Sequence, residues 1–168
     1  KPLSPITTGF AGGGMQGGTF GAAIDLTGNV WLSSYGSKSI TVFDKDGKPL
    51  TPPEGINFGG RLGLMQGIIT APNGDIFVAD GHDSAPSNNR IVKYDKTGKF
   101  LKAWGSTGSG PDQLNCPHDL AMDSQGRLFV ADRTNNRIQI FDQEGKLLDS
   151  WTHWGRVSGL SIDKNDVL

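Results

Sequence analysis

The chain contains a single cysteine, Cys116, and lacks any apolar run long enough to cross a bilayer as a helix, which takes about 20 residues. One cysteine cannot form a disulfide within the chain, so a disulfide-stapled scaffold is excluded. A surplus of positive charge is also missing, because 16 Lys and Arg stand against 17 Asp and Glu. Without an excess of positive charge to attract phosphates, we expect no nucleic-acid binding. Without a long apolar run, we expect no membrane span.

Glycine, by contrast, is abundant, with 25 among 168 residues, and its positions mark a repeated text. The copies begin AAIDLTGNVWLSS, GIITAPNGDIFVAD and DLAMDSQGRLFVAD, and continue SITVFDKDGK, NRIVKYDKTGK and NRIQIFDQEGK. Two glycines recur in each copy, first at Gly28, Gly74 and Gly126 and then at Gly47, Gly98 and Gly145. A period of roughly 40–50 residues built from short strands indicates the blades of a β-propeller.

Each copy predicts four short strands separated by turns. The first two are apolar segments on either side of the first glycine, and the third alternates apolar and polar residues. The third strand ends in an aromatic residue followed by aspartate, at Asp44, Asp95 and Asp142, and glycine follows three positions after it. Aspartate caps the amides of such a turn, and glycine adopts the left-handed conformation that the turn requires.

The expected fold class is therefore all-β, a β-propeller of four-stranded blades without helices. We place three blades at approximately residues 20–52, 64–105 and 117–152, in a single domain spanning the chain. The first residues, KPLSP, repeat KPLTP at 48–52, and the last, GLSIDKNDVL, repeat the start of a copy. We accordingly expect partial blades at 1–12 and 157–168. The blades would belong to a larger ring of about six blades, or copies of the chain would associate and cover each other's open blade faces.

Residues 117–145 resemble the NHL repeat, whose pattern P-x-G-[IL]-A-x-D, G-[NR]-[IVL]-[YF]-V-A-D and N-x-R-I-x-x-F-D-x-x-G is almost complete there. The resemblance extends over nearly the whole chain in three registered copies. NHL propellers serve as binding scaffolds, as sensor modules and as enzymes. The resemblance thus implies the fold and leaves the function open.

A narrower likeness, at residues 77–105 and 115–141, is to peptidyl-α-hydroxyglycine α-amidating lyases, six-bladed propellers that use zinc. It implies that His118, in a Pro-His pair, is a zinc ligand and that Arg133, after Val-Ala-Asp, is catalytic. His82 would replace the tyrosine base of those enzymes, or act as a further ligand.

The match to the lyases is incomplete. Phe20 stands where a second zinc histidine is expected, and the third would lie beyond Leu168. A catalytic zinc ion normally takes three protein ligands and keeps one open position.

We expect Gln66, His82, His118 and Arg133 to converge at the mouth of the central channel and to bind a ligand there. The alternative is structural. His118 would then hydrogen-bond a neighbouring loop, and Arg133 would form an ion pair, as we expect more strongly for Arg90 and Arg137. Aspartates 80 and 132 are expected to accept hydrogen bonds from turn amides, and Cys116 to be a small packed residue or a member of a soft metal site.

The balance of these observations favours a binding or interaction scaffold whose ligand, a peptide, carbohydrate or protein, occupies the central funnel or the rim. The alternative is a zinc-dependent lyase resembling the amidating lyases, so whether the chain is an enzyme stays open. Zinc is the cofactor that the lyase alternative requires, and the binding scaffold requires none. A start rich in Ser, Thr and Gly, the lone cysteine and the resemblance to bacterial NHL sequences suggest an exported bacterial protein.

Overall fold

The structure, a computed structural model, describes residues 19–34, 38–52, 55–56, 62–82 and 88–168. The partial blade expected at residues 1–12 lies outside this part of the chain. All regular structure in the described residues is β-strand, as predicted, and these residues contain no helix. No helix among them could therefore span a membrane.

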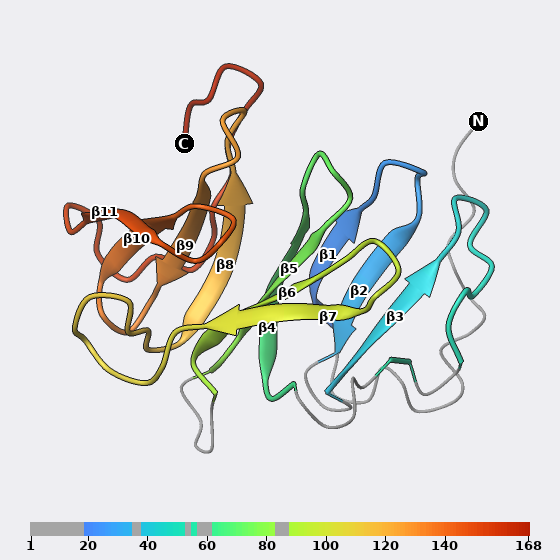
Figure 1. The fold of residues 1–168 in the computed structure, drawn as a ribbon, viewed down its shortest axis with the longest axis horizontal. Helices are drawn as coiled ribbons and strands as arrows, with labels where there is room; N and C mark the ends of the chain where they lie inside the picture. Colours follow the sequence, from blue (N-terminus) through green and yellow to red (C-terminus); the bar gives the residue numbers. More distant parts are fainter. Residues whose placement is uncertain (1–18, 35–37, 53–54, 57–61, 83–87) are drawn as a thin grey trace.

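Three antiparallel sheets follow one another along the chain (Figure 1). The first contains β1 (Thr19–Ile24), β2 (Val30–Ser34) and β3 (Ser39–Phe43). The second contains β4 (Met65–Thr70), β5 (Ile76–Asp80), β6 (Arg90–Tyr94) and β7 (Phe100–Trp104). The third contains β8 (Pro117–Met122), β9 (Leu128–Asp132), β10 (Arg137–Phe141) and β11 (Leu147–Trp151). In each sheet, strands adjacent in sequence are also hydrogen-bonded neighbours.

The first sheet departs from the four-stranded plan expected for every blade. In place of a fourth strand, the described residues after β3 form two isolated bridges, from Phe43 to Pro49 and from Ile40 to Ile56. The segment is rich in proline, and proline has no N–H to donate to a ladder. A continuous edge strand is therefore interrupted here.

The turns have the predicted chemistry. Asp44, Asp95 and Asp142 each accept two backbone N–H groups, from the second and fourth residues after them. The glycines at positions 28, 47, 74, 98, 126 and 145 all have φ between 76° and 91°. The pattern recurs near the end of the chain, where Asp163 caps a turn and Asp166, with φ 60°, occupies the glycine position. The repeat is thus encoded locally, in each turn.

The first strands β1, β4 and β8 lie side by side, as the inner strands of neighbouring blades do. Gly67 allows this close approach, because a Cβ at that position would lie 2.9 Å from the Cα of Asp119. Apolar side chains fill the spaces between the sheets, and Trp104 packs between Phe77 and Phe141 with ring centroids 6.2 Å from each. Trp104 therefore packs between the second and third sheets.

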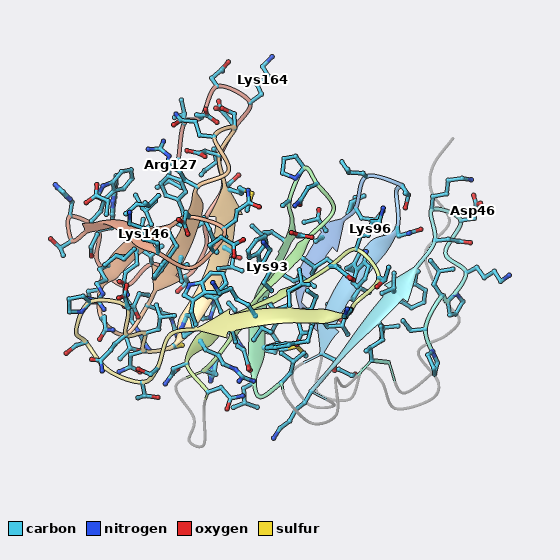
Figure 2. All side chains as sticks on the ribbon, viewed as in Figure 1. Asp46, Lys93, Lys96, Arg127, Lys146 and Lys164 are labelled. Atoms are coloured by element: carbon cyan, nitrogen blue, oxygen red, sulfur yellow. The ribbon has the colours of Figure 1, made fainter. Side chains whose placement is uncertain are left out.

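An ion-pair network centred on Lys93, which Figure 2 labels, joins the second sheet to the third. Lys93 of β6 lies 3.2 Å from Asp75 Oδ2 and 3.1 Å from Glu144 Oε1, over the ring of Phe77. Burial disfavours the Lys93 ammonium, but its hydrogen bonds to Glu144 and Asp75 outweigh burial and raise its pKa above the ordinary value. Glu144 also accepts a hydrogen bond from Lys102 through its backbone carbonyl.

Replacing Lys93 by alanine should lower the free energy of unfolding by about 1–3 kcal/mol, because the largely buried Asp75 carboxylate loses its charged partner and the packed Lys93 stem is removed. The measurement is urea denaturation followed by circular dichroism. Lys96→Ala, on the adjacent exposed turn, is the control and should change stability by no more than about 0.5 kcal/mol. Equal effects of the two substitutions would contradict this account.

Candidate functional site

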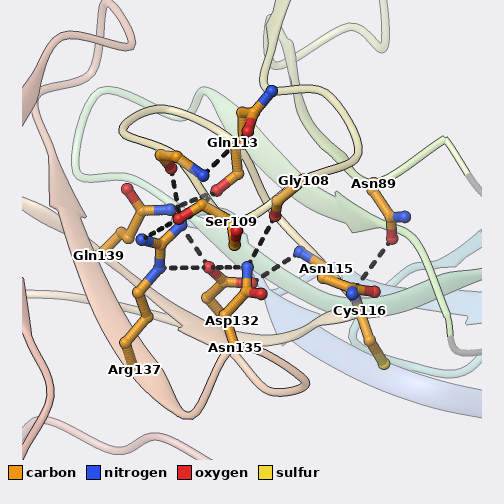
Figure 3. A network of polar contacts seen from close by, with 11 residues as sticks. Asn89, Gly108, Ser109, Gln113, Asn115, Cys116, Asp132, Asn135, Arg137 and Gln139 are labelled. Atoms are coloured by element: carbon orange, nitrogen blue, oxygen red, sulfur yellow. Dashed lines mark hydrogen bonds and ion pairs between the residues drawn. The ribbon is translucent and has the colours of Figure 1, made fainter.

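A fully buried carboxylate organises one end of the third sheet. Asp132, the last residue of β9, has no exposed surface. Its Oδ1 accepts the backbone N–H of Asn115 at 2.7 Å, and its Oδ2 accepts Asn135 Nδ2 at 2.8 Å and Arg137 Nε at 2.7 Å (Figure 3). A charge removed from water needs such partners, and here the residues before β8 and after β9 supply them.

Arg137 extends this network to the connection between β7 and β8. Its two terminal nitrogens donate to the carbonyls of Ser109, Gly110 and Gln113 at 2.8–2.9 Å. The guanidinium fork thus fixes the loop that leads into β8, with its charge balanced by Asp132.

The second sheet repeats the arrangement. Asp80, also fully buried, accepts the N–H of Gly63 at 2.7 Å, Asn88 Nδ2 at 2.9 Å and Arg90 Nε at 2.9 Å. The expectation that Asp80 and Asp132 bind turn amides is confirmed, as are the ion pairs of Arg90 and Arg137. Each pair lies within one sheet.

Asn89 and Cys116 link the two sheets beside this network. Asn89 Oδ1 accepts the N–H of Cys116 at 3.0 Å, and Cys116 has the left-handed φ of 57° that non-glycine residues seldom adopt. Its side chain is fully buried, and Arg133 Nη1 lies 3.9 Å from its sulfur. Cys116 therefore packs in the interior, directly before the Pro117-His118 pair.

His118, the second residue of β8, is half-buried, and its Nδ1 lies 2.7 Å from the backbone oxygen of Ser158. A carbonyl oxygen can only accept, so Nδ1 carries the proton in this bond. In the neutral imidazole Nε2 is then the unprotonated nitrogen, able to accept a proton or a hydrogen bond.

Arg133 and His82 lie beside this imidazole. Arg133 Nε donates to Ser158 Oγ at 3.1 Å, so Ser158 orients both the arginine and the histidine. The rings of His82 and His118 have centroids 6.4 Å apart and are inclined by 41°. Residues from the ends of two sheets and from the segment after β11 thus meet at one place.

Gln66 occupies on β4 the position that His118 occupies on β8, since each follows the residue paired with the buried aspartate of its sheet. Its side chain is buried and donates from Nε2 to the carbonyl of Met65 at 3.1 Å, while Oε1 has no hydrogen-bond partner among the described residues. Its role in ligand binding stays a prediction.

The described residues do not fit a zinc centre by themselves. His118 has the orientation of a metal ligand, because its second nitrogen donates to a carbonyl. Yet no three His, Cys, Asp or Glu side chains in the described part of the chain are placed to hold a metal ion. His82 and His118 are fewer than the three protein ligands of a catalytic zinc site, so we derive no step through a metal.

The sequence reasoning missed two residues of this site. Ser158 holds both His118 and Arg133, and Asp119 Oδ2 accepts the N–H of Leu160 at 2.9 Å, which fixes the segment that carries Ser158. A signal was available, because aligning Asp163 with Asp123 places Ser158 at the position of His118 in the next copy.

Comparison with known proteins shows the repeat and its relatives. Residues 114–141 match the NHL repeat. The human NHL repeat-containing protein 3 is 31% identical over 130 residues, which cover 69% of this chain and 36% of that protein. The peptidylglycine alpha-amidating monooxygenase of Rattus norvegicus is 33% identical over 125 residues, which cover 67% of this chain and 12% of that protein. The peptidyl-alpha-hydroxyglycine alpha-amidating lyase 1 of Drosophila melanogaster is 32% identical over 125 residues, which cover 66% of this chain and 22% of that protein.

Solved structures support the fold. A catalytically inactive virginiamycin B lyase from Staphylococcus aureus with quinupristin superposes with a TM-score of 0.67 at 17% identity, over 88% of this chain and 46% of that one. The structure of a nidogen/laminin complex gives a TM-score of 0.66 at 20% sequence identity, over 86% of this chain and 52% of that one. The chain thus carries an NHL repeat, has the β-propeller fold and spans little more than a third, or less, of the curated relatives described above.

The tautomer of His118 tests the geometry of the site. Nitrogen-15 NMR at about pH 8 should show proton occupancy on Nδ1, because only that form can donate to the carbonyl of Ser158. His153, which is exposed, is the internal reference and should show a mixture of tautomers. A proton on Nε2 of His118 would contradict the arrangement.

Proposed function

We propose that the end of the propeller carrying His82, His118 and Arg133 binds the carboxylate of a peptide ligand. The observation that carries the proposal is the convergence of His118 and Arg133 on Ser158, with the ring of His82 beside that of His118. These are groups that recognise a carboxylate and the peptide amide next to it.

Arg133 supplies the charge. Its planar guanidinium has five N–H donors, and it is half-buried, so a hydrogen bond to a carboxylate there is shielded from bulk water. Ser158 Oγ and the sulfur of Cys116 hold one edge of the group in place. An arginine fixed in this way loses less side-chain freedom on binding.

His118 supplies an acceptor of fixed direction. With its Nδ1 proton held by the carbonyl of Ser158, its Nε2 can accept an amide N–H or, when protonated, donate to the carboxylate. His82 adds a second imidazole at 6.4 Å.

Binding is favoured over catalysis because, among the described residues, only His82 and His118 bring imidazoles to this place, where zinc chemistry takes three protein ligands. The similarity to proteins named for peptidyl-glycine amidation supports a peptide as the ligand class. Their names supply no role for individual residues of this chain.

The test is calorimetric titration with N-acetyl-Ala-Phe-Gly bearing a free carboxylate and with the same peptide as its C-terminal amide. The acid should bind more tightly than the amide, and Arg133→Gln should weaken acid binding by about 10–100-fold, the value of a charge-assisted hydrogen bond. Arg156→Gln, on the exposed segment after β11, is the control and should leave the affinity unchanged. Equal affinity for acid and amide would overturn the proposal.

An amidating-lyase-like activity, with zinc as its cofactor, is the second candidate, supported by the similarity over about two thirds of the chain. The assay measures glyoxylate released from an N-acetyl-Ala-Phe-α-hydroxyglycine peptide in the presence of added zinc, with His118→Ala as the control. Release that His118→Ala abolishes would place catalysis above binding alone, whereas no release would remove this candidate.

A further inference from the structure

The spaces between neighbouring sheets are closed differently at the opposite end of the strands, where the turns lie. Between the second and third sheets, Lys93 fills the space and pairs with Asp75 at 3.2 Å and Glu144 at 3.1 Å. The three side chains form a charged plug between the first turn of the second sheet and the last hairpin of the third.

The equivalent positions between the first and second sheets carry no such plug. Val42 stands in the place of Lys93, because Val42 pairs with Trp31 as Lys93 pairs with Phe77. By the same register, Asn29 and Thr97 take the places of Asp75 and Glu144. A cavity of about 440 Å³ opens here, lined by residues 25–27, 29, 73–74 and 96–97.

The wall of this cavity on the first sheet is fixed by hydrogen bonds. Asp25 accepts from Trp31 Nε1 at 2.9 Å, from Thr27 Oγ1 at 2.7 Å and from Asn29 Nδ2 at 3.0 Å. Burial opposes ionisation of Asp25, but these hydrogen bonds and those of two backbone amides lower its pKa to about 2. The carboxylate is therefore ionised at neutral pH and keeps its neighbours in place.

The hydrogen bonds also determine what the wall can offer a ligand. The Nδ2 group of Asn29 donates to Asp25 and to Thr27 Oγ1, at 3.0 and 2.8 Å, so its remaining capacity is the acceptor Oδ1. The hydroxyls of Thr27 and Thr97 donate to Asp25 and Asp95, so they too can face a ligand only as acceptors. Lys96, exposed at the rim, adds donors.

We propose that this cavity is a second binding site, for a neutral polyhydroxyl ligand, a mono- or disaccharide. Sugar hydroxyls donate to the acceptors of Asn29, Thr27 and Thr97 and accept from the ammonium of Lys96. The one carboxylate and the one ammonium that line the cavity, Asp25 and Lys96, offset each other, so the lining presents no net charge to a ligand. The volume lies within the range of small-molecule sites, roughly 300–1,000 Å³. The site is independent of the carboxylate site, which lies at the opposite end of the strands and involves the second and third sheets.

The test is titration of the nitrogen-15-labelled chain with glucose, N-acetylglucosamine, maltose and cellobiose at millimolar concentrations, followed by amide chemical shifts. At least one sugar should shift the amides of residues 25–29, 73–74 and 96–97. Thr97→Glu, which places a carboxylate in the cavity, should lower the affinity for that sugar at least tenfold. Combining it with Asn29→Asp and Val42→Lys rebuilds the charged plug and should abolish binding.

Gln125→Glu is the matched control, because it adds the same charge to an exposed turn of the third sheet, outside the cavity, and should leave sugar binding unchanged. The proposal is overturned if none of the four sugars shifts the amides of the cavity. It is also overturned if the shifts gather at His82 and Arg133, or if Thr97→Glu and Gln125→Glu weaken binding equally.

Discussion

The buried carboxylate at the end of the second strand is the interaction on which the rest of this structure depends. In the third sheet Asp132 binds the amide before β8, the asparagine after β9 and the arginine that begins β10. Asp80 does the same in the second sheet. Since an ionised group without solvent is tolerated only when its oxygens are satisfied, each aspartate ties the residues before the first strand of its sheet to the connection between the second and third strands. Arg133 directly follows Asp132, and His118 lies three residues after Asn115. The hydrogen bonds of Asp132 therefore fix where both side chains lie.

The two ends of the strands have different chemistry. At the end with the buried aspartates, His118 and Arg133 contact Ser158 and His82 lies beside His118, so this end offers a guanidinium and two imidazoles. At the other end, the turns present carboxylates and hydroxyls, and the space between sheets is either filled by Lys93 and its partners or left as a cavity. The same repeat thus supports two kinds of surface, because residues outside its strands and capped turns vary from copy to copy.

Much of the fold was predictable because the repeat is encoded locally. An aspartate and a glycine three residues apart specify the turn after the third strand of each sheet, and both were recognised from the sequence. The pairing of Arg137 with Asp132 was expected for the same reason, since the two lie five residues apart across one hairpin. Ser158 was missed because its contacts with His118 and Arg133 span 40 and 25 residues and depend on how the segment after β11 packs. The inward turn of Gln66 toward its own backbone likewise has no local signal.

The most direct test replaces Asp132 by serine, the residue that the first sheet carries at this position as Ser34. Amide hydrogen exchange is measured for Asn115, whose N–H the carboxylate binds, together with the NMR signals of His118. If the buried carboxylate holds the site together, Asp132→Ser will speed exchange at Asn115 and shift His118, while the turn at Asp95 keeps its protection. A folded variant in which Asn115 stays protected and His118 is unchanged would contradict the account.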